Sequence, residues 1–140
     1  MTAADSSVWI DLLNGKRTLQ TDILYGELEH DRVAIHDLVK VEILLGYDDD
    51  REHEAVKQRL TAFETITTTS EALITETVNN YRELRRRGVT IRKTVDTLIA
   101  SECIFSRRPL LFNDRDFFPF VTYFGLRNAA DLTYTDHTPR

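Results

Sequence analysis

The chain has 140 residues, of which 41% are hydrophobic, 29% are charged, 5 are glycine and 3 are proline, so one globular domain is expected and a disordered or collagen-like chain is excluded. The single cysteine excludes an intramolecular disulfide and a cysteine-based zinc site, and the net charge of −5 argues against a general nucleic-acid coat protein. The charge is uneven, because residues 1–81 hold 7 Lys/Arg against 16 Asp/Glu whereas residues 82–115 hold 9 against 4, which leaves room for a phosphate-binding edge.

The first half of the chain alternates short apolar runs with amphipathic segments. In chain order we predict a strand over 2–4, helices over 7–14 and 18–29, a strand over 33–35, and helices over 37–45 and 48–63. Gly15 and Gly46 are expected to end the helices that precede them, and Asp37 is expected to cap the third helix.

The second half continues the same alternation. We predict a β-branched strand over 65–68, a long helix capped by Ser70 and ended by Gly88, a helix over 94–105, a strand over 110–112, a loop over 114–116 and an aromatic segment over 117–125 whose type the pattern leaves open. Residues 1–130 are expected to form one domain and residues 131–140 a polar tail.

Short, unbroken apolar strands between helices are typical of a parallel sheet covered on both faces. The sequence therefore predicts a single-domain, three-layer α/β/α sandwich with a short central parallel sheet. The first residues resemble no secretory signal and no apolar run is long enough to span a membrane, so we expect a cytoplasmic protein without membrane contact.

Acidic residues follow two of the predicted strands, Asp5 after the first and Asp114 and Asp116 after the fourth. Because ligands of open parallel sheets bind beyond the carboxyl ends of the strands, these acids are candidates for one site. Glu42 and Asp96 lie on helices between apolar neighbours and can reach the same edge. Each acid alone can equally be a helix cap, a turn residue or a solvated helix residue, so the hypothesis depends on their convergence.

Clustered carboxylates repel one another, and a bound divalent cation removes that repulsion. Oxygen ligands without histidine or cysteine suit Mg²⁺ or Mn²⁺ rather than zinc. Such a site can activate water and hold a phosphodiester for in-line displacement.

The remaining candidates have simpler interpretations. The four histidines show no metal-ligand spacing and no obvious partner, and Cys103 is expected in the core. Basic side chains that are candidates for weak RNA contacts, but that can also form a solvated face, are Arg85, Arg86, Arg87, Arg92, Lys93 and Arg115.

Four segments in chain order resemble motifs of a known family: Asp-Ser-Ser-Val-Trp-Ile-Asp over 5–11, Val-Glu-Ile-Leu-Leu-Gly over 41–46, Gly-Val-Thr-Ile-Arg over 88–92 with Thr-Val-Asp-Thr-Leu-Ile-Ala over 94–100, and Leu-Leu-Phe-Asn-Asp-Arg-Asp-Phe over 110–117. The chain resembles PIN-domain proteins, specifically VapC-type toxin ribonucleases of VapBC toxin–antitoxin pairs. Each motif is short, but the ordered set spans most of the chain.

The resemblance implies that the catalytic, metal-binding acids are Asp5, Glu42, Asp96 and Asp114. It implies that Asp116 is an auxiliary metal ligand and that Ser7 orients the cluster. The chain departs from the family at Phe112, where a threonine, serine or histidine is usual.

The resemblance further implies a homodimer that cuts RNA, often transfer RNA, with Mg²⁺ or Mn²⁺ and is inhibited by a VapB-type antitoxin. A catalytically silent PIN-like interaction module is the alternative, and loss of an acid would indicate it. A phosphoacceptor domain is disfavoured because no aspartate follows the third predicted strand and no lysine follows Lys93.

Overall fold

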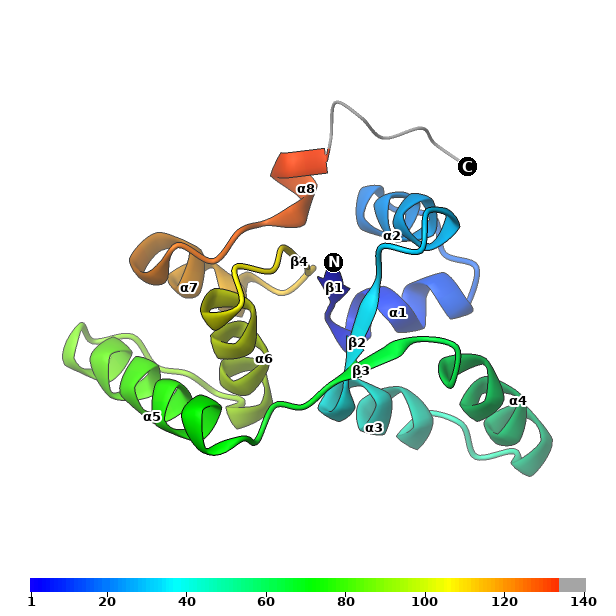
Figure 1. The fold of residues 1–140 in the computed structure, drawn as a ribbon, viewed down its shortest axis with the longest axis horizontal. Coiled ribbons are helices and arrows are strands. Elements are labelled where there is room, and N and C mark those ends of the chain that lie inside the picture. Colours follow the sequence, from blue (N-terminus) through cyan, green and yellow to red (C-terminus); the bar gives the residue numbers. More distant parts are fainter. Residues whose placement is uncertain (134–140) are drawn as a thin grey trace.

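The computed structural model describes residues 1–133 and shows short parallel strands between two groups of helices (Figure 1). The elements in chain order are β1 (Ala3–Ala4), α1 (Ser6–Leu13), α2 (Leu19–Glu29), β2 (Ala34–His36), α3 (Asp37–Leu45), α4 (Asp50–Leu60), β3 (Glu64–Ile66), α5 (Glu71–Arg86), α6 (Thr94–Phe105), β4 (Leu110–Leu111), the 3-10 turn η1 (Arg115–Phe117), α7 (Phe118–Phe124) and α8 (Ala129–Thr133). Helices α5, α6 and α7 lie on one side of the strands and α1, α2 and α4 on the other, which confirms the predicted α/β class (Figure 1).

The strands pair in parallel, and this pairing brings distant parts of the sequence together. Strand β1 pairs with β4, Ala3 opposite Leu110 and Ala4 opposite Leu111. Strand β2 pairs with β3 from Ala34 opposite Glu64 to His36 opposite Ile66, and one bridge between Thr2 and Val33 connects the two pairs. The carboxyl ends of all four strands therefore face one edge, where the first and fourth strands are neighbours.

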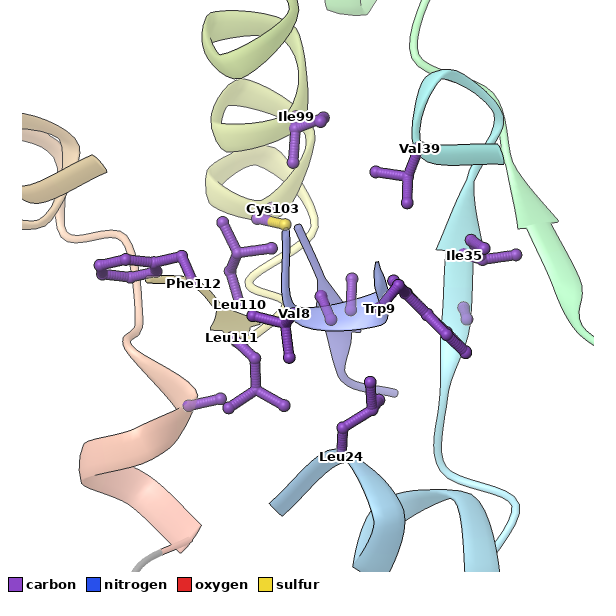
Figure 2. Packing of buried hydrophobic residues seen from close by; sticks show 14 of the residues in the cluster. Val8, Trp9, Leu24, Ile35, Val39, Ile99, Cys103, Leu110, Leu111 and Phe112 are labelled. Carbon is purple, nitrogen blue, oxygen red and sulfur yellow. The ribbon is translucent and has the colours of Figure 1, made fainter. Parts of the chain in front are cut away.

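The core is built from the strands and from the helix faces turned toward them (Figure 2). Ala3 and Ala4 of β1 are fully buried and belong to the same core cluster as Val8 and Trp9 of α1 and Cys103 of α6. Burial of each large apolar side chain contributes roughly 1.5–3 kcal/mol to folding. Cys103 is thus a core residue, as its spacing predicted.

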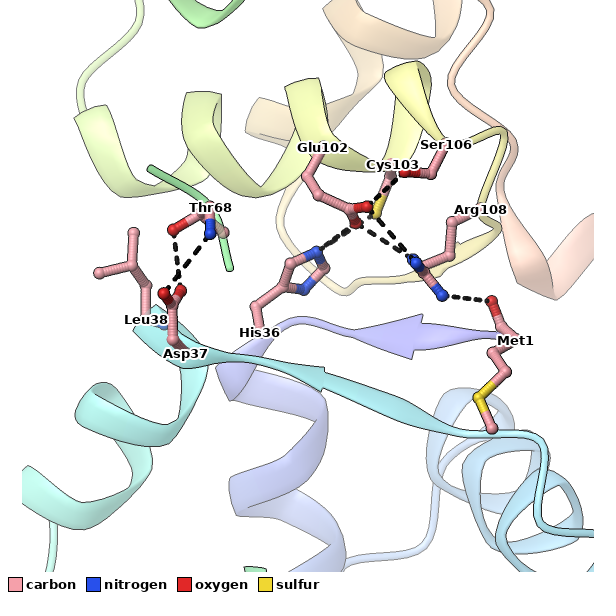
Figure 3. A network of polar contacts seen from close by, with 9 residues as sticks. All are labelled: Met1, His36, Asp37, Leu38, Thr68, Glu102, Cys103, Ser106 and Arg108. Carbon is pink, nitrogen blue, oxygen red and sulfur yellow. Dashed lines mark hydrogen bonds and ion pairs between the residues drawn. The ribbon is translucent and has the colours of Figure 1, made fainter. Parts of the chain in front are cut away.

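Ser70 caps α5 as predicted, whereas Asp37 does not cap α3. Thr18 accepts a hydrogen bond from the Thr21 amide in a capping box, and the Ser70 hydroxyl accepts one from the Leu73 amide. Asp37 is the first residue of α3 rather than its cap, and its carboxylate instead accepts a hydrogen bond from the Thr68 hydroxyl at 2.8 Å (Figure 3). Thr68 therefore lies outside the strand that was predicted to include it, and β3 ends at Ile66.

The segment of uncertain type after the fourth strand is helical. Phe117 of η1 and Phe120 of α7 are fully buried, and Gly125 ends α7 with a left-handed φ of 72°. Helix α8 was not predicted, and it extends through the first three residues of the expected tail to Thr133. The rest of that expected tail lies outside the described residues.

A polar network crosses the core and joins β2 to the far end of α6 (Figure 3). The His36 ring lies 2.7 Å from the Glu102 carboxylate, which also accepts hydrogen bonds from the Ser106 hydroxyl at 2.6 Å and the Arg108 guanidinium at 3.1 Å. Arg108 donates in addition to the carbonyl oxygen of Met1 at 3.3 Å. His36 therefore has a partner that the sequence did not indicate.

Among the described helices, none is long and apolar enough to cross a membrane.

Candidate metal centre

Four acidic side chains reach the carboxyl edge of the strands from four different elements. Asp5 directly follows β1, and its amide donates to the Leu111 carbonyl at 2.9 Å, which fixes it beside the end of β4. Asp114 lies just beyond β4, Asp96 lies in the first turn of α6, and Glu42 lies in the middle of α3. The fold thus places all four predicted acids at the same edge.

Asp5 is a buried carboxylate, with 6% of its surface exposed. Its pKa is raised by burial, and hydrogen bonds from the Ser7 hydroxyl and the Ser6 and Ser7 amides oppose that effect only in part. The Ser7 hydroxyl lies 3.1 Å from Oδ2, which supports the predicted role of Ser7 in orienting this acid.

Asp96 shows most clearly that the acids share one pocket. It is 4% exposed, and its pKa is raised to about 7 by burial and then by the negative charges of Asp5, Glu42 and Asp114. Lys93 opposes this rise but does not cancel it. A carboxylate shifted this far by its neighbours marks a place where negative charge is concentrated.

Glu42 is half-buried and incompletely satisfied. Burial and the charge of Asp5 raise its pKa, against the lowering effects of Ser6 and Lys93. Its Oε1 atom is inaccessible to solvent and has no hydrogen-bond partner among the described residues. A buried oxygen without a donor is costly for a folded protein, and a cation would satisfy it.

Asp116 joins the cluster from the turn after β4. The Asp114 carboxylate accepts a hydrogen bond from the Asp116 amide at 2.9 Å, which holds the turn in shape. Asp96, Asp114 and Asp116 each offer one oxygen within 4.8 Å of the others. The carboxylate donors of this pocket fit a hard divalent cation such as Mg²⁺ or Mn²⁺.

The basic residues assigned to RNA contacts separate into two groups. Arg92 lies 3.2 Å from Asp116, and the Lys93 ammonium lies 4.0 Å from Asp114, so both lie beside the acid pocket. Arg115 is exposed at the start of η1. The remaining three lie at the end of α5, where Arg86 and Arg87 pair with Glu83 and where the guanidinium groups of Arg85 and Arg87 lie over the rings of Tyr81 and Tyr123.

Two features of the site were not foreseen. The Asn113 amide lies within 3.5 Å of the Ser7 hydroxyl and 3.4 Å of the Asp11 carboxylate, so it joins the β4 turn to α1. Phe112, the residue that departs from the family pattern, is buried and packs against Phe117 and Phe118 with ring centroids 5.2 and 5.4 Å apart. The turn that carries Asp114 is therefore held by aromatic packing at this position.

Comparisons with known proteins agree with this fold. VapC ribonuclease Mb1587 of Mycobacterium bovis and Ribonuclease VapC11 of Mycobacterium tuberculosis are each 24% identical over 132 residues, which covers 93% of this chain and 98% of each relative. A VapBC2 complex from Rickettsia felis, bound to a DNA fragment of its promoter, superposes with a TM-score of 0.67 at 21% identity, and a toxin–antitoxin complex from Klebsiella pneumoniae with 0.60 at 19%. Each structure match covers 84% of this chain and 90% of the other.

The family model of the PIN domain matches residues 3–119, a range that contains every acid of the pocket. The four motifs, the parallel strands and the convergent carboxylates all fall within that match. The chain therefore belongs to the PIN domain family, which confirms the resemblance seen in its sequence.

Proposed function

We propose that this protein is a divalent-metal-dependent endoribonuclease and that it acts as the toxin of a VapBC-type toxin–antitoxin pair. The observation that carries the proposal is the convergence of Asp5, Glu42, Asp96 and Asp114 in one pocket, three of them with raised pKa values. The names of the full-length relatives, which describe VapC ribonucleases, support the same assignment.

The metal would be held by oxygens of the four acids, with Asp116 as an auxiliary ligand. Mg²⁺ or Mn²⁺, when bound, would supply an acidic centre that promotes attack of water on a phosphodiester. Asp5 is fixed by the strand end and by Ser7, so its carboxylate is positioned before the ion arrives. Asp96 would release its proton as the pocket gains positive charge.

We further propose RNA as the substrate, with structured RNA such as transfer RNA as the first candidate. Arg92 and Lys93 lie at the rim of the pocket, where their charges can meet a phosphate. A VapB-type antitoxin as inhibitor, a homodimer and a cytoplasmic location complete the proposal, and the toxin–antitoxin complexes among the structural relatives support the first of these.

A catalytically silent PIN-like module is the alternative function. It would tolerate loss of an acid or neutralisation of the pocket, whereas all four acids are present and, within residues 1–133, one buried oxygen of Glu42 has no hydrogen-bond partner. The pocket therefore favours the enzyme.

The test is cleavage of bulk transfer RNA with Mn²⁺, with circular dichroism on the same samples. We expect Asp5→Asn, Glu42→Gln, Asp96→Asn and Asp114→Asn each to slow cleavage at least roughly 10²-fold, the scale of losing one positioned catalytic group. All four variants should fold, because each removes a repelling charge.

Asp11→Asn is the matched control, because Asp11 lies on α1 and, among the described residues, its carboxylate accepts a hydrogen bond from Asn113 and from none of the four acids' partners. Its cleavage rate should change little, and that of Asp116→Asn should fall less than that of the four acids. Folded Asp5→Asn and Asp96→Asn proteins that cut RNA as fast as the wild type would refute the proposed mechanism.

A further inference from the structure

A small pocket opens between α5 and α6, two helices that pack against each other (Figure 1). Its volume is about 220 Å³, and it is lined by three residues of α5 and two of α6: Thr77, Val78, Tyr81, Thr94 and Thr97. Among the described residues, none that lines this pocket carries a charge. The pocket is therefore apolar apart from its hydroxyl groups.

Two of these hydroxyl groups are buried without a partner. Thr77 is 7% exposed and Thr97 is 1% exposed, and within residues 1–133 neither Oγ1 atom has a hydrogen-bond partner. The same helix interface satisfies other polar groups, because the Asn80 amide donates to the Ser101 hydroxyl at 3.0 Å. A buried hydroxyl without a partner is costly, so two of them in one pocket indicate a ligand that supplies the missing hydrogen bonds.

Each hydroxyl can turn toward a molecule in the pocket without a change of backbone. Rotation about χ1 exchanges the hydroxyl and the methyl group of a threonine, and threonine populates two such rotamers in helices. A hydroxyl also donates and accepts, so the pair can match either kind of polar atom on a ligand.

The surroundings of the pocket are positively charged. Residues 82–93, which connect its two sides, hold six Lys/Arg against one Asp/Glu. The Arg85 guanidinium lies 5.9 Å from the centre of the Tyr81 ring, and a neighbouring hollow on α5 is lined by Arg82, Arg85 and Arg86. This charge favours a ligand that carries phosphates over an apolar side chain of a protein partner.

The pocket and the acid cluster share the first turn of α6. Thr94, Asp96 and Thr97 lie within one helical turn, about 5.4 Å of rise. The two threonines are three residues apart and share the face that meets α5, whereas Asp96 lies on the face that meets the other acids. A nucleotide next to a phosphate at the acid cluster would therefore lie within reach of the pocket.

We propose that this pocket binds one nucleobase of a single-stranded RNA segment next to the cleavage site. A base is flat and uncharged, which suits an apolar pocket with a tyrosine ring, and its edge offers the polar atoms that the two hydroxyls lack. The phosphates on either side of that base meet the cations of residues 82–93. The proposal rests on the ribonuclease function proposed above and assigns substrate selection to Thr77, Tyr81 and Thr97.

The test compares RNA octamers with an abasic octamer that has the same phosphates. Fluorescein-labelled oligo(A), oligo(C) and oligo(U) are each titrated with the full chain in EDTA at fixed salt, and fluorescence anisotropy gives Kd. The wild type should bind at least one of them about tenfold tighter or more than the abasic octamer, the scale of one stacked base.

The pocket variants should reduce this preference for bases. Thr77→Val/Thr97→Val keeps the shape of both side chains and should reduce it roughly two- to tenfold, the scale of one or two neutral hydrogen bonds. The affinity for the abasic octamer should stay unchanged. Because the two hydroxyls have no partner in the free protein, this variant should unfold at the same urea concentration as the wild type or a higher one. Tyr81→Leu should reduce the preference about fivefold or more.

The matched control is Ser101→Ala, which removes a hydroxyl that is already paired in the same helix interface. It should lower stability and leave the preference for bases unchanged. A wild type that binds the abasic octamer as tightly as all three RNA octamers would overturn the proposal. An unchanged preference in Thr77→Val/Thr97→Val would overturn it as well and leave the pocket to a protein side chain.

The outcome is distinguishable from failure of the proposed function. A preference for bases that falls in the pocket variants, without RNA cleavage by the wild type in Mn²⁺, would support this inference and refute the ribonuclease. Cleavage by the wild type, together with a preference that the pocket variants retain, would overturn this inference and leave the ribonuclease in place.

Discussion

Helix α6 carries two buried carboxylates in opposite surroundings. Asp96 in its first turn is 4% exposed and Glu102 near its other end is 2% exposed. Burial and three nearby carboxylates raise the pKa of Asp96 to about 7. Burial also disfavours the charged form of Glu102. Hydrogen bonds from His36, Ser106 and Arg108 outweigh this effect and lower its pKa to about 2. The same helix thus holds one acid whose charge is stabilised by hydrogen-bond donors and one whose charge is opposed by its neighbours.

The difference separates a structural carboxylate from a functional one. His36, Glu102 and Cys103 also offer three potential ligand atoms within 4.8 Å of one another. Arg108 and Ser106 already donate to that carboxylate, and burial raises the pKa of the Cys103 thiol, which disfavours the thiolate that a metal needs. Burial alone therefore does not indicate a binding site, whereas burial beside several other negative charges does.

The largest expected effect is the loss of folding stability when the Glu102 side chain is removed. Glu102→Ala should lower the free energy of unfolding by about 3–5 kcal/mol, because it leaves the buried His36 and the Arg108 guanidinium without their partner. Urea denaturation measures the loss. The control is Glu83→Ala, which removes exposed pairs with Arg86 and Arg87 and should cost less than about 1 kcal/mol. Equal losses in the two variants would remove the distinction between a buried network and a surface pair.

At Asp96 the expected effect has the opposite sign, because replacing this side chain should stabilise the metal-free protein. Because the pKa of Asp96 is raised on folding, its protonated form stabilises the metal-free protein below about pH 4, and this contribution is lost as pH rises through about 7. Asp96→Asn has no such loss, so its advantage in metal-free melting temperature over wild type should grow from pH 4 to pH 8. Thermal melting in the presence of a chelator measures it.

Divalent metal provides the control for that prediction. Millimolar Mg²⁺ or Mn²⁺ at pH 8 should raise the melting temperature of the wild type more than that of Asp96→Asn, because the ion compensates the charge that the variant lacks. An advantage of Asp96→Asn that stays constant with pH would contradict the shared pocket.

The pH dependence that Glu102 contributes has the opposite direction. Its lowered pKa stabilises the fold above about pH 4.5, and this contribution is lost as pH falls through about 2.

The acids of the pocket were predictable from sequence because their positions follow from local rules. Asp5 and Asp114 come directly after short apolar runs, and parallel strands bring their carboxyl ends to one edge. Glu42 and Asp96 could be added because both lie on helices between apolar neighbours, and both also lie in the family motifs. The order of strands and helices followed from the alternation of apolar runs with amphipathic segments.

The rest could not be predicted, because it depends on contacts between distant residues. His36 and Glu102 are 66 positions apart, and no pattern in either segment indicates their pairing. Arg92 and Lys93 were assigned to RNA, but their contacts with Asp116 and Asp114 depend on how the turn after β4 packs beside α6. Helix α8 has only five residues, too few for a periodic signal.

The smallest expected effect concerns the basic end of α5, which is set apart from the pocket by its partners. Arg86 and Arg87 already pair with Glu83, and Arg85 and Arg87 lie over tyrosine rings. Each arginine must therefore break a weak contact within the protein before it can bind a phosphate. If they track the RNA backbone, Arg85→Gln/Arg86→Gln/Arg87→Gln should flatten the slope of log affinity against log salt by about 0.7–0.9 per lost contact.

The slope can be measured by fluorescence anisotropy with labelled transfer RNA on the Asp5→Asn background, which prevents cleavage during the titration. A triple variant on α4, Arg51→Gln/Lys57→Gln/Arg59→Gln, removes the same charge from another exposed helix and corrects for the change in net charge. A difference between the two slopes identifies phosphate contacts at the end of α5. Equal slopes would show that these arginines form a solvated face, and that RNA binding depends on the cations that contact Asp114 and Asp116.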